Sequence, residues 1–453
     1  MNFKKIKSVH FIGIGGIGVS AIARYFLAQG TRVSGTDRAS SEITEALQKE
    51  GVAISIDEEF VRNIPTDSEL IIYSAALEVA EPEFMKEMKK LSVPALSYSE
   101  ALGEISKSKR TIAISGTHGK TTTTAMIASV LIDAGLEPTV IVGSVLVREE
   151  SNFVGGKGEW LVVEADEYRR SFLSLSPEVL VITNIDRDHL DYFKDIDDIR
   201  SAYAELSAKV PKEGTIVTDL NDENVWSVIQ AARPVRSREG SQRASASNGV
   251  KAAKAPILDY TSVGAEGLQL KFPGAHNIAN AQAALAVAGF LGISPSTSLR
   301  ALNEFRGTWR RFEHLGETKC GALVYDDYAH NPQKIQALLA GVKEQFPDKR
   351  VIAIFQPHLY SRTKHLLPEF ADSFADADLI ILAPIFPARE EPDPSISHKI
   401  LAEEIKKQTG REAMVLDSFK EIAQRVNELA GKDDIILTIG AGDIYKVAHL
   451  LVT

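Results

Sequence analysis

The stretch "TIAISGTHGKTTTT", residues 111–124, combines a strand, a glycine-bearing loop and a helix that opens on threonines. The N–H groups of such a loop surround a phosphate, while Lys120 reaches its outer oxygens and the Thr121 hydroxyl holds Mg²⁺. The stretch departs from the commonest phosphate loop, because Ile114 stands where that loop has its first glycine. A simple strand-to-helix turn is the alternative interpretation. The spacing favours a nucleoside triphosphate site made of Gly116, Thr117, His118, Gly119, Lys120, Thr121 and Thr122.

Two polar clusters follow the next apolar strands. Glu164, Asp166 and Glu167 end the run "WLVVEADE". The second cluster follows "VLVIT" and consists of Asn184, Asp186, Asp188, His189 and Asp191. Open α/β sheets bind ligands at the carboxyl ends of their strands, and magnesium prefers carboxylate oxygens. We therefore expect Glu164 to hold Mg²⁺ and His189 to belong to the site. Asp191 or Asp195 is interpreted as a helix cap.

The N-terminal stretch "FIGIGGIGVSAIARYFLAQGTRVSGTD", residues 11–37, supplies a second nucleotide pattern. Gly13, Gly15 and Gly18 follow an apolar run and open a helix, so the backbone can approach a pyrophosphate. Asp37 lies nineteen residues after Gly18, about where a carboxylate grips a ribose hydroxyl. A dehydrogenase stays open at this point, because the pattern fits any pyrophosphate-linked nucleotide. Lysines before residue 8 resemble the start of a secretion signal, but the glycines that interrupt the apolar run favour a βαβ unit.

Length, charge and cysteine content narrow the class of protein. A chain of 453 residues predicts roughly three domains. The formal net charge of −10 argues against a nucleic-acid partner. No run reaches the roughly 18 apolar residues that a membrane span requires, so we expect no membrane insertion. The single cysteine, Cys320, excludes an intrachain disulfide and favours a cytoplasmic location. Its place at the edge of an apolar run favours a structural role over a catalytic thiol.

Alternating apolar strands and helical segments predict an α/β fold with three domains. The expected strands include 9–14, 32–36, 70–75, 111–115, 160–164, 179–183, 322–327, 350–355, 379–384, 413–417 and 435–440. The polar stretch 104–110 is interpreted as a linker, and a helix over about 277–291 closes the middle domain. The segment 233–256, rich in Ser, Ala and Arg, is interpreted as a surface loop without chemistry. The expected domains are 1–107, 108–312 and 313–453.

Eight motifs occur in the order seen in the Mur ligase family, which the chain resembles across all three domains. They are "GIGGIGVSAIA", "SGTHGKTTTT", "EADE", "NIDRDHLD", "HNIANAQAA", "RRFE", "DDYAHNP" and "FQPHLYSRT". The resemblance implies an N-terminal Rossmann-like UDP-binding domain, a central P-loop-type ATPase domain and a C-terminal Rossmann-like domain that binds an amino acid. It also implies that the first glycine loop holds the pyrophosphate of a UDP-sugar, with no nicotinamide and no hydride transfer.

The resemblance assigns roles to matching positions. It implies Lys120 on the β/γ-phosphates of ATP, Asn280 and Arg311 as further nucleotide ligands, and Asp326 or Asp327 at the ATP end of the third domain. Thr121 and Glu164 would hold Mg²⁺, and His189 a second metal ion. The implied UDP-sugar residues are Gly13, Gly15, Ile17, Gly18, Asp37 and Ser74. The implied amino-acid residues are His330, His358 and Arg362, of which Arg362 would pair with the carboxylate. Many relatives have an arginine where this chain has Leu359. Lys120, His189 and Arg311 are the implied catalytic residues.

The implied activity is amide-bond formation in peptidoglycan precursor synthesis. L-Alanine is joined to the carboxylate of UDP-N-acetylmuramate through an acyl phosphate, with ATP as co-substrate and Mg²⁺ as cofactor. Because water would hydrolyse the acyl phosphate, we expect hinge motions near 104–110 and 308–316. A recycling ligase that adds a murein tripeptide to the same UDP-sugar is the alternative within the family. A dehydrogenase would leave "GTHGKTTTT" unexplained, and a non-catalytic regulator would be expected to lack Lys120, Glu164 or His189.

Overall fold

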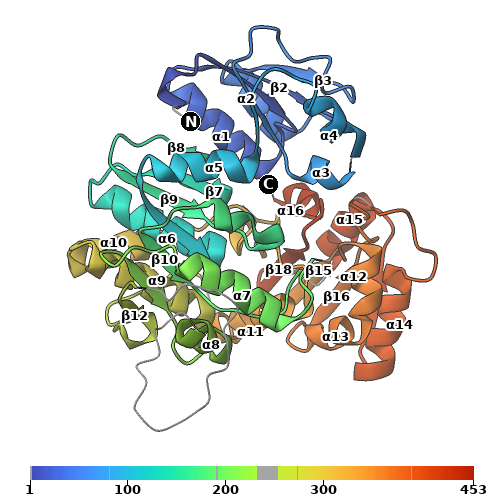
Figure 1. The fold of residues 1–453 in the computed structure, drawn as a ribbon. Helices are drawn as coiled ribbons and strands as arrows, with labels where there is room; N and C mark the ends of the chain where they lie inside the picture. The colour runs from blue at the N-terminus through green and yellow to red at the C-terminus, as the bar shows by residue number, and fades with distance from the viewer. Residues whose placement is uncertain are drawn as a thin grey trace, which may run out of the picture. The chain divides into compact units, whose positions relative to one another are not determined.

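The computed structural model describes residues 3–80, 82–189, 192–231, 254–272, 274–388 and 390–452. In these residues three β-sheets alternate with helices along the chain (Figure 1), so the predicted α/β class is confirmed. The chain divides into two compact units. Unit 1 comprises Met1–Gln269 and Ala279–Arg306, and unit 2 comprises Leu270–Ile278 and Gly307–Thr453. Asp191 and most of the predicted loop at 233–256 lie outside the described residues.

The first sheet of unit 1 has five parallel strands in the order β3-β2-β1-β4-β5, the arrangement of doubly wound nucleotide-binding folds. Its strands are β1 (Ser8–Ile12), β2 (Arg32–Asp37), β3 (Ala53–Ile56), β4 (Leu70–Tyr73) and β5 (Ala95–Ser97). The accompanying helices are α1 (Ile17–Ala28), α2 (Glu42–Lys49), α3 (Ala76–Ala80), α4 (Pro82–Met88) and α5 (Tyr98–Lys107). Every residue of β1 and β4 is buried, as expected of central parallel strands that are covered on both faces.

The second sheet of unit 1 has seven strands in the order β12-β11-β10-β6-β9-β7-β8, and β8 alone runs antiparallel to its neighbour. Its strands are β6 (Arg110–Ser115), β7 (Thr139–Leu146), β8 (Ser151–Val154), β9 (Trp160–Glu164), β10 (Val179–Ile182), β11 (Thr215–Thr218) and β12 (Ile257–Asp259). The phosphate-loop pattern lies between β6 and α6, as predicted. The carboxyl ends of β6, β9 and β10 therefore meet at one edge of the sheet, since these strands are parallel neighbours.

Five α-helices and the 3₁₀ segment η2 accompany this second sheet, in addition to the short 3₁₀ segment η3 (Tyr260–Ser262). They are α6 (Lys120–Asp133), α7 (Ile196–Ser207), α8 (Glu223–Ala231), α9 (Ala275–Phe290), α10 (Pro295–Glu304) and the 3₁₀ segment η2 (Tyr168–Ser174). The Asp195 side chain caps α7 by accepting a hydrogen bond from the Asp198 N–H at 2.9 Å, which confirms the predicted cap. The predicted helix near 277–291 is α9. Throughout the described parts of the chain, every helix is too short or too polar to cross a membrane.

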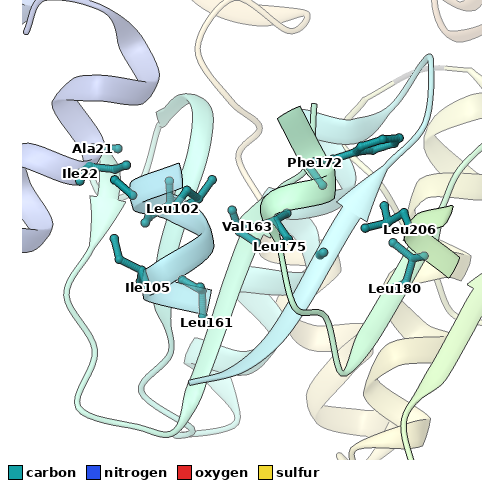
Figure 2. Close-up of a cluster of buried hydrophobic side chains, with 14 of the residues drawn as sticks. Ala21, Ile22, Leu102, Ile105, Leu161, Val163, Phe172, Leu175, Leu180 and Leu206 are labelled. Carbon is teal, nitrogen blue, oxygen red and sulfur yellow. The ribbon is translucent and has the colours of Figure 1, made fainter. Parts of the chain in front are cut away.

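The prediction that residues Glu104–Arg110 form a linker is wrong. Helix α5 continues through Lys107, and β6 already begins at Arg110. The reason is that α5 has two faces: Lys107 is exposed, whereas Leu102 and Ile105 are buried. Figure 2 shows Leu102 and Ile105 beside Ala21 and Ile22 of α1 on one side, with Leu161 of β9 near the other end of the helix. One continuous hydrophobic core thus joins the two sheets of unit 1.

Unit 2 contains a six-stranded sheet in the order β13-β14-β18-β15-β16-β17, in which only β13 is antiparallel to its neighbour. Its strands are β13 (Glu313–Glu317), β14 (Leu323–Asp327), β15 (Arg350–Phe355), β16 (Leu379–Leu382), β17 (Ala413–Val415) and β18 (Asp434–Ile439). Its helices are α11 (Pro332–Gln345), α12 (Tyr360–His365), α13 (Leu367–Ala371), α14 (His398–Thr409), α15 (Phe419–Leu429) and α16 (Tyr445–Leu451). The five strands predicted for this region are all present.

Candidate functional site

The phosphate-loop pattern adopts a tight turn at the N-terminus of α6. Gly119 has φ of +83°, a left-handed conformation that favours glycine, and it directly precedes the first helical residue. A Cβ atom at Gly119 would lie 2.5 Å from the Asn280 side-chain oxygen. That oxygen also accepts a hydrogen bond from the Thr123 hydroxyl at 3.0 Å. The structure therefore brings Asn280, 160 residues away in sequence, against the loop that the sequence predicts.

The end of β10 holds the loop in place. The His118 N–H donates to the Asn184 side-chain oxygen at 2.9 Å, and the Thr183 hydroxyl donates to the His118 carbonyl at 2.6 Å. The Asp186 N–H donates to the Thr117 hydroxyl at 2.9 Å. These bonds fix the loop from the neighbouring strand, so the polar residues after "VLVIT" shape the phosphate site in addition to lining it.

Lys120 lies inside this loop in a mostly buried position. Its ammonium group donates to the Gly116 carbonyl at 2.6 Å and to both carboxylate oxygens of Glu167 at 3.0 and 2.8 Å. Burial would lower the pKa of Lys120, but the carboxylates of Glu167 and Asp166 outweigh that effect and raise the pKa above its ordinary value. Burial raises the pKa of Glu167, against the opposing charge of Lys120. The site thus keeps a charged lysine in the phosphate loop.

Thr121 and Glu164 form the pair that the sequence predicts as a magnesium site. The Thr121 hydroxyl donates to one Glu164 oxygen at 3.0 Å, and the other oxygen accepts the Gly143 N–H at 2.9 Å. A Cβ atom at Gly143 would lie 2.7 Å from the same carboxylate. Glycine at 143 therefore lets strand β7 approach Glu164 closely and aim its oxygens at Thr121.

Three further groups gather beside the loop. Ligand atoms of Asp166, Glu167 and His189 all lie within 4.8 Å of one another, and His189 Nε2 lies 3.8 Å from a Glu167 oxygen. The His189 ring also contacts the Tyr168 ring, with 4.8 Å between their centroids. Two carboxylates and an imidazole at this spacing can hold a divalent cation. The structure thus groups His189 with Asp166 and Glu167, whereas Thr121 and Glu164 form a separate pair.

The N-terminal glycine loop lies at the end of β1 in unit 1. Gly13 has φ of +73°, and a Cβ atom there would lie 3.0 Å from Ser74 Cβ, so Ser74 borders the loop. The Gly15 N–H donates to the Asp37 carboxylate at 2.7 Å. A Cβ atom at Gly18 would lie 2.7 Å from the Tyr98 ring. The predicted residues of this loop therefore lie together, and Asp37 braces the loop from the end of β2.

In unit 2 the adjacent arginines of "WRRFE" have different environments. Arg310 is 3% exposed and donates to Asp326 at 2.7 Å, to the Gly442 carbonyl at 2.7 Å and to the Gly440 carbonyl at 2.5 Å. The second Asp326 oxygen accepts the Thr438 hydroxyl at 2.5 Å. Arg310 and Asp326 thus form a fully engaged buried ion pair that ties β14 to the loop after β18.

Arg311 lies beside the second aspartate of β14. Its guanidinium carbon is 5.1 Å from the centroid of the Tyr328 ring. Burial raises the pKa of Asp327, while the charge of Arg311 and bonds from the Ala329 and Phe312 N–H groups act against it. His276 also faces Asp327, and burial lowers the pKa of this imidazole while the carboxylate acts in the opposite direction. Arg311, Asp327 and His276 therefore form one polar group in unit 2.

The predicted amino-acid residues also lie together in unit 2. The His330 and His358 rings are 6.3 Å apart, and an Arg362 N–H lies 3.4 Å from His358 Nδ1. His358 stacks on Phe386 with 5.5 Å between centroids. Burial and then the Arg362 charge lower the pKa of His358 to about 4, and burial lowers the pKa of His330 well below its ordinary value. Both imidazoles are thus neutral beside a cationic Arg362.

Leu359 directly precedes α12 with φ of +71°, and its N–H donates to the Phe386 carbonyl at 2.9 Å. This bond connects the start of α12 to the residue on which His358 stacks. The unusual backbone at Leu359 therefore helps to fix the histidine and arginine of "FQPHLYSRT" relative to each other.

Several contacts of the site escaped the sequence interpretation. Glu167 and Asn184 were noted as members of polar clusters, but the bond of Glu167 to Lys120 and that of Asn184 to His118 depend on which strands are neighbours. His276 opens the motif "HNIAN", which was a usable signal. Gly143 carries no local signal, because only its approach to Glu164 makes it special.

The fold and the loop around Lys120 define an α/β nucleotide-binding protein with a P-loop-type site. Three family models match successive parts of the chain: "Mur ligase family, catalytic domain" over residues 8–110, "Mur ligase middle domain" over 114–288 and "Mur ligase, glutamate ligase domain" over 310–442. The chain belongs to the Mur ligase family.

Relatives match over nearly the whole chain. A UDP-N-acetylmuramate--L-alanine ligase of Clostridium kluyveri is 41% identical over 455 residues, which cover 99% of this chain and 98% of the relative. The solved UDP-N-acetylmuramate-alanine ligase of Thermotoga maritima is 30% identical with a TM-score of 0.78, and the match covers 98% of this chain and 97% of that chain. A murein peptide ligase of Psychrobacter arcticus shares the fold at 22% identity and a TM-score of 0.68, over 98% of each chain.

Proposed function

We propose that the protein is an ATP-dependent ligase that joins L-alanine to the carboxylate of UDP-N-acetylmuramate. The observation that carries the proposal is the charged Lys120 inside the phosphate loop, next to the Thr121–Glu164 pair. This arrangement occurs in a chain whose full-length relatives are named for that reaction. The domains we propose are 1–107, 108–312 and 313–453, and we propose a cytoplasmic location, where ATP is available.

ATP binding is assigned to the loop and its neighbours. The N–H groups at the start of α6 would face the phosphates, and Lys120 would donate to the β- and γ-phosphate oxygens. Asn280 packs against Gly119 and would contact the nucleotide. In unit 2 we assign Arg311 to the γ-phosphate. Asp327 is the better nucleotide candidate of the two aspartates, because Asp326 is 1% exposed and pairs with Arg310, whereas Asp327 is half-buried and faces Arg311.

The residues present fit Mg²⁺. Thr121 Oγ1 and Glu164 Oε1 lie 3.0 Å apart, and a hydroxyl with one carboxylate is the usual protein share of a magnesium site on a nucleotide. We assign a second divalent ion to His189 with Asp166 and Glu167, whose ligand atoms lie within 4.8 Å of one another. When bound, Mg²⁺ neutralises negative charge on the phosphoryl group that is transferred.

The chemistry explains why ATP is needed. A carboxylate is a poor acyl donor because oxide is a very poor leaving group. Attack of the UDP-N-acetylmuramate carboxylate on the γ-phosphorus releases ADP and gives an acyl phosphate. The amine of L-alanine then attacks the carbonyl carbon, and the tetrahedral intermediate expels phosphate. Lys120 and Arg311 would stabilise charge that develops during phosphoryl transfer.

The two substrates other than ATP are assigned to the remaining groups. The loop with Gly13, Gly15 and Gly18 would hold the UDP pyrophosphate at the N-terminus of α1, which begins at Ile17. Asp37 and Ser74 border this loop. Arg362 would pair with the alanine carboxylate, and the neutral His330 and His358 would line the same pocket.

Release of ADP tests this proposal. The reaction contains ATP, Mg²⁺ and UDP-N-acetylmuramate, with L-alanine, glycine, L-serine or the L-Ala-D-Glu-diaminopimelate tripeptide as acceptor. The proposal expects release that requires both the UDP-sugar and L-alanine, with a product heavier than the UDP-sugar by one alanyl residue. Release only with the tripeptide would assign the protein to the recycling reaction, and no release with any acceptor would contradict the ligase proposal.

A further inference from the structure

A hairpin of the second sheet, β7–β8, is bonded to the helix that carries the N-terminal glycine loop. Asn152 of β8 is 1% exposed. Its amide nitrogen donates to the Ile17 carbonyl at 2.5 Å and lies 2.8 Å from the Ser20 hydroxyl oxygen, and its oxygen accepts an Arg24 N–H at 2.6 Å. One buried side chain therefore contacts the first two turns of α1, which begin directly after the glycine loop.

The rest of β8 follows the same helix. The Phe153 ring meets the Tyr25 ring edge-on with 6.4 Å between centroids, and a Cβ atom on Gly155 would lie 3.5 Å from Ala28 Cβ. Arg24 is in turn held by Glu50, with its nearest contact at 2.7 Å. Residues 152–155 thus lie along α1 from Ile17 to Ala28, and Asn152 supplies the hydrogen bonds at the end nearest the glycine loop.

The other strand of this hairpin reaches the candidate metal pair. The Gly143 N–H of β7 donates to Glu164 at 2.9 Å, and Glu164 is bonded to Thr121. The β7–β8 pairing is irregular between Ile141 and Leu146, the segment that contains Gly143. One short hairpin therefore bonds to the carboxylate of the proposed metal site and to the first turn of α1.

We propose that the β7–β8 hairpin positions the UDP-sugar loop relative to the Thr121–Glu164 site, and that Asn152 is the positioning residue. This inference rests on the proposed function, in which the sugar carboxylate must reach the γ-phosphate of ATP. A misplacement of about 1 Å between reacting groups can cost roughly 100-fold in rate. A buried amide with all of its polar atoms engaged holds such a distance well, because each lost bond would leave a buried polar group unpaired.

Hydrogen exchange tests the positioning itself, without reference to activity. Asn152→Leu keeps the approximate volume but removes the three contacts. Asn152→Asp keeps an acceptor for Arg24 but removes the donor to Ile17, and it serves if the leucine variant does not fold. We expect amides 19–22 of α1 to exchange at least about tenfold faster in either variant. Leu206→Ala is the matched control, because Leu206 is buried in α7, outside the hairpin and α1. Unchanged exchange at 19–22, or an equal change in the control, would overturn the inference.

Kinetics test its consequence for the reaction. We expect kcat to fall about 10- to 100-fold in Asn152→Leu while the Kd of a non-hydrolysable ATP analogue stays within about twofold. Leu206→Ala, assayed at the same distance below its melting temperature, is expected to keep its kcat within about threefold. An unchanged kcat in Asn152→Leu would overturn the positioning role. Absence of UDP-sugar-dependent turnover in the unmodified protein would instead contradict the proposed function. The hydrogen-exchange result would still decide whether the β7–β8 hairpin holds α1 in position.

Discussion

Each unit contains a buried ion pair between a cation and a carboxylate, and the two pairs differ in what else the cation contacts. Each of the three guanidinium nitrogens of Arg310 in unit 2 donates a hydrogen bond, one to Asp326 and two to carbonyls of the loop after β18. Lys120 in unit 1 contacts Glu167 and one loop carbonyl, and it borders the backbone turn at the start of α6. The Arg310 pair is surrounded by bonds within unit 2, whereas the Lys120 pair lies at the edge of the candidate phosphate site.

Burial of an ion pair therefore does not by itself identify its role. Burying two charges is costly, and breaking such a pair leaves the remaining charge without compensation. In unit 2 the geometry offers no place for a ligand at Arg310, so the pair is structural. In unit 1 Lys120 borders the turn at the start of α6, where we propose that the ATP phosphates bind, and Glu167 keeps this lysine charged.

The largest expected effect follows from removing Lys120. In Lys120→Ala, ADP release should fall by about 1,000-fold, because the cation that stabilises the transferring phosphoryl group is lost. The melting temperature should also fall, because Glu167 stays buried when it loses its partner, so the kinetics are compared at the same distance below each protein's melting temperature. Steady-state kinetics and a thermal melt measure the two quantities. Lys212→Ala, at a lysine side chain that is 74% exposed, is the control and should change neither. Activity within tenfold of the unmodified protein would contradict the proposed role of Lys120.

The second prediction distinguishes the roles of the neighbouring arginines of unit 2, Arg310 and Arg311. Arg310→Met should lower the free energy of unfolding by about 3 kcal/mol or more, because Asp326 is left buried and uncompensated. Arg311→Met should change stability by less than about 1 kcal/mol and lower ADP release about 100-fold. Urea titration and the ADP assay are compared on both variants. A reversed pattern, with Arg310→Met stable but inactive, would show that the structural and functional arginines have been exchanged.

A smaller effect concerns the Thr121–Glu164 pair. Thr121→Val removes the hydroxyl but keeps the side-chain shape, so the Mg²⁺ concentration for half-maximal activity should rise about tenfold. Thr121→Ser retains the hydroxyl and should need nearly the same Mg²⁺ concentration as the unmodified protein. The measurement is ADP release as a function of Mg²⁺ at saturating ATP. An unchanged requirement in Thr121→Val would mean that this hydroxyl does not serve the metal.

The sequence predicted most of the strands because parallel strands buried on both faces are continuous apolar runs. β9 and β18 are of this kind. It did not predict β3, β5, β7, β8, β11, β12 or β13. Of these, β8 and β13 are antiparallel edge strands whose mixed residues carry no apolar pattern. The linker prediction at 104–110 failed because the charged residues there conceal that α5 continues to Lys107 and buries Ile105 and Ser106.

The candidate site was predictable where its residues share a motif. Gly116 to Thr122 form one loop in the sequence and in the structure. The roles of Arg310 and Arg311 could not be separated, because they depend on a backbone turn in which Arg310 and Phe312 both have positive φ, +58° and +48°. The role of Asn152 could not be predicted from the sequence, because its partners on α1 lie more than 120 residues away in the chain.

The last prediction concerns His10, a buried base that is not part of an ion pair, and the dependence of stability on pH. His10 of β1 is 1% exposed, and its ring nitrogens lie 2.9 Å from the Ser34 hydroxyl and 3.1 Å from the Thr36 hydroxyl. Burial lowers the pKa of His10 from 6.5 to about 4. The unfolded chain therefore binds more protons here than the folded chain between these two values. The stability that neutral His10 provides is complete above pH 6.5 and is lost as the pH falls toward 4.

Between pH 6.5 and 5.5 this group should cost the folded protein about 1 kcal/mol. Urea titrations at the two pH values are compared for the unmodified protein and for His10→Gln, whose amide can bond to both hydroxyls but does not titrate. The variant should lose about 1 kcal/mol less over this interval, and His365→Gln, at an exposed histidine of α12, is the control. Equal losses in the unmodified protein and in His10→Gln would mean that His10 is protonated in the fold. A buried cation would then exist without a carboxylate, contrary to what the pairs at Lys120 and Arg310 indicate.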